Sequence, residues 1–97
     1  MAQIVWNKRA SKQFADIQKY LQEEFGEKSA QMFTVRTFTF LELLLKFPQV
    51  GSVENPEKDI RGLLLHRHTT ILYKQKQENI YILALFDNRQ HPNKKKT

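Results

Sequence analysis

The spacing of apolar residues changes once along the chain, at Pro48, and this change restricts the fold more than any other feature. Before Pro48, apolar residues recur every three or four positions, which is the period of an amphipathic helix. After it, short runs of strand-forming residues are separated by polar turns. The first helical stripe comprises Ala10, Phe14, Ile17, Leu21 and Phe25, and the second comprises Ala30, Phe33, Thr37, Phe40, Leu44 and Phe47. Helices followed by strands are typical of the α+β class.

Residue types that begin and end helices divide this pattern into elements. Asn7 can cap a first helix after a short strand at residues 3–6, and Gly26 suits the left-handed position that closes it. A second helix is expected at residues 27–46, a loop at 49–58, and strands at 60–66, 69–76 and 79–86. The predicted order is β-α-α-β-β-β, with a helix hairpin packed on one face of a small antiparallel sheet. The 97 residues form one domain, in which residues 90–97 are a basic tail.

Positive charge is concentrated near the C-terminus. Residues 1–60 contain eight Lys or Arg and eight Asp or Glu, whereas residues 61–97 contain eight Lys or Arg against only Glu78 and Asp87. The net charge of +6 therefore comes from the last 37 residues. A basic field on one part of a protein attracts polyanions or an acidic protein partner. The three lysines at 94–96 are equally well explained as a solvated tail.

Several classes of site are missing from the sequence. There is no cysteine, no Gly-rich phosphate loop and no pair of carboxylates near a histidine, so no cofactor is expected. His66 and His68, with His91 as a third ligand, have the spacing of a metal site, but solvated turn histidines explain them better. No apolar run approaches the roughly 20 residues that span a bilayer, so no membrane contact is expected. A cysteine-free chain of this kind is compatible with the cytoplasm.

Basic residues on the predicted strands are the candidate functional groups. Alternation places Arg61, Leu63, Leu65 and Arg67 on one strand face, which we expect to be the sheet face that the helices leave open. Two arginines around two leucines suit an interface better than a core. On the next strand, Lys74 and Lys76 share a face with Leu72, whereas Tyr73 points the other way and is expected to pack. The second helix carries more apolar residues than one neighbouring helix can cover, so part of it faces either the core or a partner.

The element order and six local strings resemble the RelE/ParE superfamily of bacterial toxins, nearer its ParE-like, plasmid-stabilisation branch. These strings are residues 4–10, 25–28, 46–52, 60–61, 71–73 and 85–92. The resemblance implies a type II toxin that arrests growth when it is free of a cognate antitoxin. RelE-like members cleave mRNA on the ribosome and are endoribonucleases, whereas ParE-like members inhibit DNA gyrase and need no enzymatic activity.

The resemblance also implies roles for particular residues. Arg61 and Arg89 match positions where the ribonuclease branch orients the scissile phosphate, so they are the candidate catalytic groups. Thr70 stands where RelE-like enzymes have a catalytic arginine, which favours the ParE-like branch. Residues expected to bind the target or the antitoxin are Leu63, Leu65, Arg67, Lys74, Lys76 and His91.

Two other interpretations stay open. Arg89 can instead be a structural partner of Asp87, in which case its removal lowers stability as well as activity. The chain can also be a non-catalytic nucleic-acid-binding module that uses Arg61, Arg67, Lys74 and Lys76 as phosphate contacts.

Overall fold

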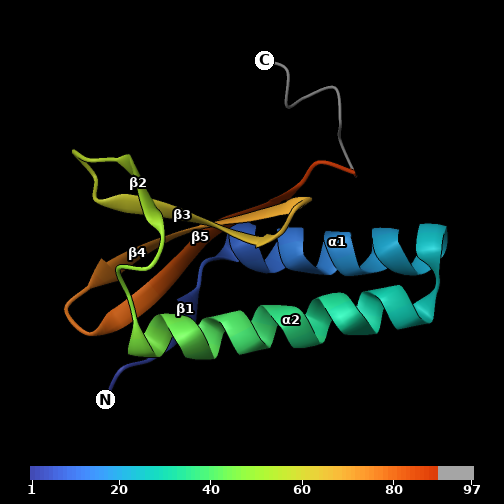
Figure 1. Cartoon of the computed structure of the whole chain (residues 1–97), viewed down its shortest axis with the longest axis horizontal. Coiled ribbons are helices and arrows are strands. Elements are labelled where there is room, and N and C mark those ends of the chain that lie inside the picture. Colours follow the sequence, from blue (N-terminus) through green and yellow to red (C-terminus); the bar gives the residue numbers. More distant parts are fainter. Residues whose placement is uncertain (90–97) are drawn as a thin grey trace.

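A computed structural model describes residues 1–89, in which two helices lie against a five-stranded sheet (Figure 1). The elements are β1 (Ile4–Trp6), α1 (Lys8–Phe25), α2 (Glu27–Lys46), β2 (Ser52–Asn55), β3 (Ile60–His66), β4 (Thr69–Lys76) and β5 (Asn79–Asp87). The α+β class and the helix hairpin are confirmed. No helix within residues 1–89 is long and apolar enough to cross a membrane.

The helix boundaries follow from the residues that cap them. The Asn7 side chain accepts a hydrogen bond from the Ala10 amide at 2.7 Å, which satisfies one of the free N–H groups of the first turn of α1. Gly26 has a φ of 98°, a conformation that costs other residues more, and it lets α2 begin immediately after α1. The two helices therefore form a tight hairpin, as the sequence predicts.

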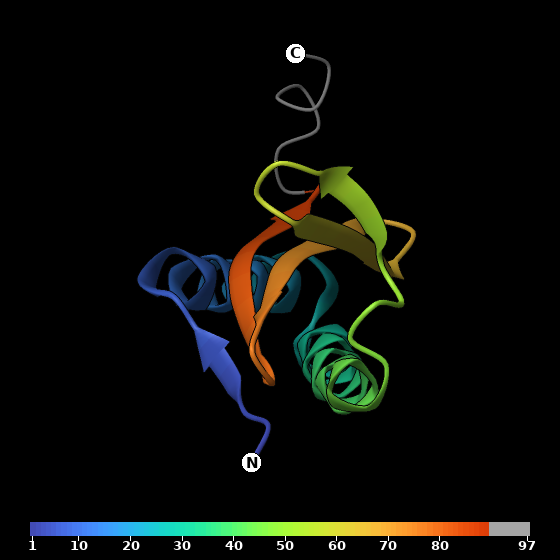
Figure 2. The same ribbon diagram turned by 90° about the vertical axis from the view of Figure 1, so that its left-hand side faces the viewer.

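The sheet has the strand order β1-β5-β4-β3-β2 and is mixed (Figure 2). Strands β3, β4 and β5 form the expected antiparallel meander. The prediction of an entirely antiparallel sheet is wrong at one edge, because β1 pairs with β5 in parallel. The prediction of a loop over residues 49–58 is also wrong in part, because β2 pairs with β3 at the other edge. This strand is short, polar and largely exposed, so it has no apolar alternation to reveal it.

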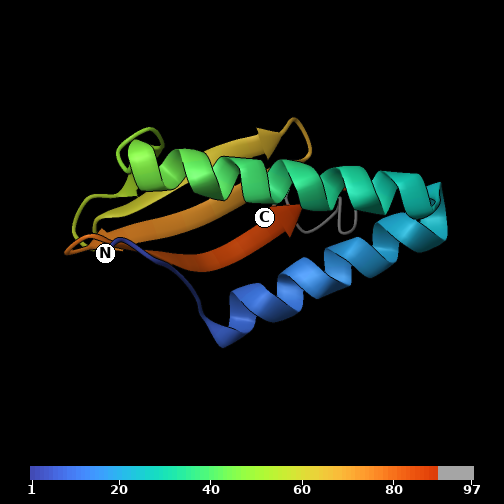
Figure 3. The same cartoon turned by 90° about the horizontal axis from the view of Figure 1, so that it is seen from below.

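The core lies between the helices and one face of the sheet. Figure 3 shows α2 lying across the strands, with α1 on the β5 side. Tyr73, Ile71 and Ile82 of the sheet are fully buried and belong to one apolar cluster with Leu44 of α2 and Ile17 of α1. We call the sheet face that carries Tyr73 and Ile71 the helix-side face, and the opposite one, which carries Leu72 and Lys74, the open face. Directly paired residues on neighbouring strands share a face, so the register assigns the other positions.

Candidate functional site

Arg61 lies on the helix-side face, and the prediction that it projects from the open face is wrong. It is paired with Tyr73, which is fully buried. Its guanidinium Nη1 donates hydrogen bonds to the carbonyl oxygen of Gly51 at 2.8 Å and to that of Gln49 at 3.2 Å. Alternation along β3 separates the two faces as far as Leu64, where the register shifts, but it could not show which face the helices cover. Arg61 thus holds the connection between α2 and β2.

Tyr73 stabilises the same connection from inside the core. Its hydroxyl donates to the Pro48 carbonyl at 2.9 Å and accepts from the Gly51 amide at 2.8 Å. The packing role predicted for Tyr73 is confirmed, and its hydroxyl has a second role in fixing the loop. A Cβ atom at Gly51 would lie 2.8 Å from this hydroxyl oxygen, so only glycine fits there without a shift.

The leucines of β3 that were expected on an open binding face are buried or partly buried, and the one between them is exposed. Leu65 is only 4% exposed and belongs to the core, and Leu63 packs against the core from the helix-side face. Their predicted place on an open binding face is therefore wrong, because that face is the one that packs on the helices. Leu64, which the sequence analysis did not select, is 59% exposed. Arg67 is exposed in the turn after β3.

The open face combines exposed apolar residues with lysines. Leu64 is paired with Thr70, and Thr70 is paired with Phe86, which is 45% exposed. Lys74 lies on the same face as Leu72, as predicted, and Lys76 is exposed at the end of β4. Phe86 was missed because β5 is apolar at nearly every position, so its pattern does not distinguish the two faces.

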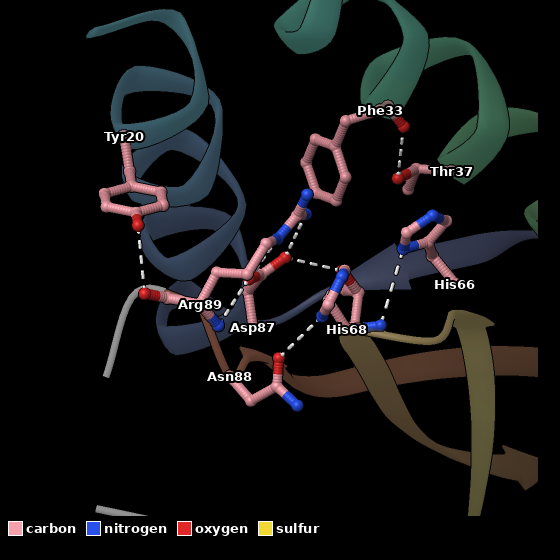
Figure 4. Close-up of polar contacts among 9 residues, drawn as sticks. Tyr20, Phe33, Thr37, His66, His68, Asp87, Asn88 and Arg89 are labelled. Atoms are coloured by element: carbon pink, nitrogen blue, oxygen red, sulfur yellow. Dashed lines mark hydrogen bonds and ion pairs between the residues drawn. The ribbon is translucent and has the colours of Figure 1, made fainter. Parts of the chain in front are cut away.

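Arg89 is bound to Asp87, the buried carboxylate at the end of β5 (Figure 4). Its Nε and Nη2 donate to the two carboxylate oxygens at 3.0 and 2.7 Å, and its backbone amide donates to Asp87 at 3.0 Å. Thr69 donates to the same carboxylate at 2.7 Å. Burial opposes the charge of Asp87, but these hydrogen bonds outweigh burial and hold the pKa of Asp87 below its ordinary value of 3.8. The geometry matches the interpretation of Arg89 as a structural partner of Asp87.

A cleft lies beside this ion pair, between α2 and the sheet. It has a volume of about 190 Å³, and its lining includes Arg36 of α2, His66 of β3 and Arg89. Arg36 was not among the candidates from the sequence, because a single arginine on an apolar helix gives no signal of its own. Burial lowers the pKa of His66, and the charges of Arg36 and Arg89 lower it further. Three cationic or titratable groups from separate elements therefore share one small space.

The histidines form no metal site in the described part of the chain. The rings of His66 and His68 lie 5.2 Å apart, and His68 Nδ1 is 3.1 Å from the Asn88 side-chain oxygen. Within residues 1–89, no three His, Cys, Asp or Glu side chains are grouped in a way that could hold a metal ion. His91 and the basic tail at 90–97 lie outside the described residues.

The outer side of α2 leaves apolar residues uncovered. Met32, Val35 and Phe38 are between 49% and 66% exposed. Met32 and Val35 line an open groove of about 600 Å³ that continues past Arg36 to Leu65. The sequence left open whether the excess apolar residues of α2 face the core or a partner. The core covers one side of the helix only, and the other side remains exposed, as a surface for a partner would be.

Several solved structures share this fold. The chromosomal ParDE toxin–antitoxin system from P. aeruginosa has a solved structure that superposes with a TM-score of 0.73 at 20% identity, covering 90% of this chain and 96% of that one. A YoeB/ParE toxin from Agrobacterium tumefaciens superposes with a TM-score of 0.59 at 8% identity, covering 88% and 96%. A conserved hypothetical protein from Helicobacter pylori gives 0.52 at 17% identity, covering 92% and 97%. These likenesses show the fold.

The sequence itself gives the family. A search of curated proteins finds no match. Residues 4–92 match the family model described as the ParE toxin of the type II toxin-antitoxin system, parDE. Because this match spans nearly the whole sequence, the chain belongs to the ParE family of type II toxins.

Proposed function

We propose that this toxin acts in the cytoplasm by binding DNA gyrase, without catalysing a reaction. The observation that carries the proposal is the placement of Arg61 and Arg89. Both match catalytic positions of the ribonuclease branch, yet Arg61 is bonded to two loop carbonyls and Arg89 to a buried carboxylate. Cleavage of a phosphodiester needs groups that transfer protons as well as groups that hold the phosphate. An arginine stays charged and does not transfer protons, and neither arginine faces the open side of the sheet.

The open face supports binding to a protein. Its exposed Leu64 and Phe86 offer apolar contacts, and Lys74 offers positive charge farther along the same face. Thr70, between the two apolar residues, is uncharged where RelE-like enzymes carry an arginine. An apolar centre with charge at its margin is the usual anatomy of a protein interface, and its positive sign suits an acidic surface on the target.

The antitoxin is a second partner, which membership of the ParE family implies. We assign it to the outer side of α2, where the groove beside Met32 and Val35 is apolar and is flanked by Lys28 and Arg36. An amphipathic helix with acidic residues beside its apolar stripe complements such a groove. The toxin would then be covered on α2 when the antitoxin is bound.

Purified toxin distinguishes the two targets. We expect it to block supercoiling of relaxed plasmid by gyrase, and to leave mRNA intact in a ribosomal translation reaction. Leu64→Glu should abolish the inhibition, because it places a charge in the apolar centre of the open face. Gln22→Glu, an exposed change on α1, is the matched control and should inhibit as wild type. Cleavage of ribosome-bound mRNA with normal supercoiling would refute the proposal.

A further inference from the structure

The cleft between α2 and the end of the sheet has no role in binding the proposed target, although it gathers positive charge, and it shares Arg36 with the groove assigned to the antitoxin. Arg36, His66 and Arg89 line it together. They come from α2, from β3 and from the segment after β5, so the fold brings together residues that are far apart in sequence. We propose that this cleft binds a phosphate group. The site lies on the helix-side face, so the proposal of phosphate binding can be tested independently of the target binding proposed for the open face.

Arg89 is oriented before any ligand arrives. Asp87 accepts from its Nε and from one Nη2 donor, at 3.0 and 2.7 Å, as Figure 4 shows, and the guanidinium also lies 5.9 Å from the centre of the Phe25 ring. An arginine has five N–H donors, so the others remain for a ligand. The Arg89 side chain is 26% exposed, which leaves it reachable from solvent. A fixed, partly buried guanidinium loses little conformational entropy on binding an anion.

Arg36 is the complementary group on the helix. Its guanidinium makes no hydrogen bond or ion pair within residues 1–89. Its guanidinium donors are therefore available, and a guanidinium matches the spacing of phosphate oxygens by donating two parallel hydrogen bonds. Two arginines from different elements of the lining, one fixed and one free, can donate to different oxygens of the same phosphate.

The other polar groups of the cleft select for an anion. The hydroxyls of Ser29, Thr37 and Thr69 donate to Phe25, Phe33 and Asp87, so their protons are already used. The donors left over belong to the arginines and to His66, and a neutral ligand would not satisfy their charge. Drug-sized ligands occupy cavities of about 300 Å³ or more, whereas this one has about 190 Å³. The cleft therefore suits a single phosphate group, free or carried by a larger molecule that stays outside.

His66 gives the site a readout of its own. The groups whose charge acts on it are Arg36, Arg89, His68 and Arg67, all of the same sign. Together with burial, they lower the pKa of His66 below 6.5. A phosphate between His66 and the two arginines would reverse this effect, because a nearby negative charge favours the protonated ring. Phosphate should therefore raise the pKa of His66, and it should bind more tightly as the pH falls through that pKa.

Titration of the whole chain with inorganic phosphate, adenosine monophosphate and acetate tests the site. Calorimetry should detect saturable phosphate binding, and NMR should show the His66 pKa rising with it. Arg36→Gln should weaken binding by about tenfold or more, since each charge-assisted hydrogen bond contributes that much. Arg9→Gln removes the same charge outside the cleft, from an arginine that lies over Phe86, and should leave the affinity within about twofold, because charges on the surface are screened.

Each outcome decides the proposal. Equal affinity for inorganic phosphate and adenosine monophosphate assigns the site to phosphate itself. Tighter binding of adenosine monophosphate assigns it to the phosphate of a nucleotide. Both results support phosphate binding in the cleft. No saturable binding, acetate binding as tight as phosphate, or an equal effect of Arg9→Gln would overturn it. Melting curves of both variants must match wild type, and Arg36→Lys then serves as a second test, since it keeps the charge and should restore part of the affinity.

Discussion

Tyr73→Phe removes one oxygen atom from the centre of the fold and should destabilise it strongly. The Tyr73 side chain is 0% exposed, and its hydroxyl bonds both the Gly51 amide at 2.8 Å and the Pro48 carbonyl at 2.9 Å. Without it, the buried Gly51 amide loses its partner, and a buried polar group left unpaired costs about 1–3 kcal/mol. The Pro48 carbonyl is only half-buried and can recover water. We expect a loss of about 2–3 kcal/mol in the free energy of unfolding, which for a domain of this size lowers the melting temperature by roughly 10–20 °C.

Urea unfolding followed by circular dichroism measures this loss. The matched control is Tyr81→Phe, because Tyr81 is half-buried on the open face and its hydroxyl makes no hydrogen bond within residues 1–89. Tyr81→Phe should change the free energy of unfolding by less than about 0.5 kcal/mol. If Tyr73→Phe were equally mild, the two hydrogen bonds would not hold the loop, and the structural role assigned to this connection would be refuted.

Four further outcomes follow from the same structure. Gly51→Ala should lower the urea midpoint at least as much as loss of the tyrosine hydroxyl, because its Cβ would lie 2.7 Å from a backbone carbonyl of β3. The lowered pKa of Asp87 means that its contribution is complete above about pH 4 and is lost as the pH falls through its folded-state pKa, so Asp87→Asn should flatten acid unfolding curves below pH 4. The lowered pKa of His66 means that the unfolded chain binds more protons, so stability should fall as the pH drops below about 6.5, and a His66→Gln variant should lack this step. Arg61→Ala and Arg89→Ala should each lower the melting temperature together with growth arrest; full toxicity at wild-type stability would exclude both roles.

The helices and the meander could be predicted because their signals are local. Asn7 and Gly26 mark helix ends by their own chemistry, and the apolar stripes require no knowledge of neighbours. The parallel pairing of β1 and the existence of β2 depend on contacts between distant segments. β1 is only three residues long and β2 is polar, so neither strand has an apolar alternation that could specify its pairing partner.

The functional residues were harder to place because alternation does not say which face is covered. In β3, Leu63, Leu64 and Leu65 are consecutive, so both faces look apolar, and the register skips at Leu65. Arg61 and the leucines were therefore assigned to the wrong side of the sheet. The pairing of Arg89 with Asp87, two residues apart, was open to sequence reasoning as an alternative, since it is local. Arg36 could be recognised only once α2 was packed beside His66.

The basic charge that looks like one field in the sequence is divided by the sheet. Lys74 lies on the open face, whereas Arg61 is bonded to loop carbonyls on the helix-side face. A nucleic-acid-binding module would need Arg61, Arg67, Lys74 and Lys76 on one surface, because phosphate contacts add up only along a continuous track. Arg61 and Lys74 do not share such a surface, and Arg61 has already used donors within the chain. The separation argues against that alternative, and it favours a protein target that meets the apolar centre and the lysines of the open face alone.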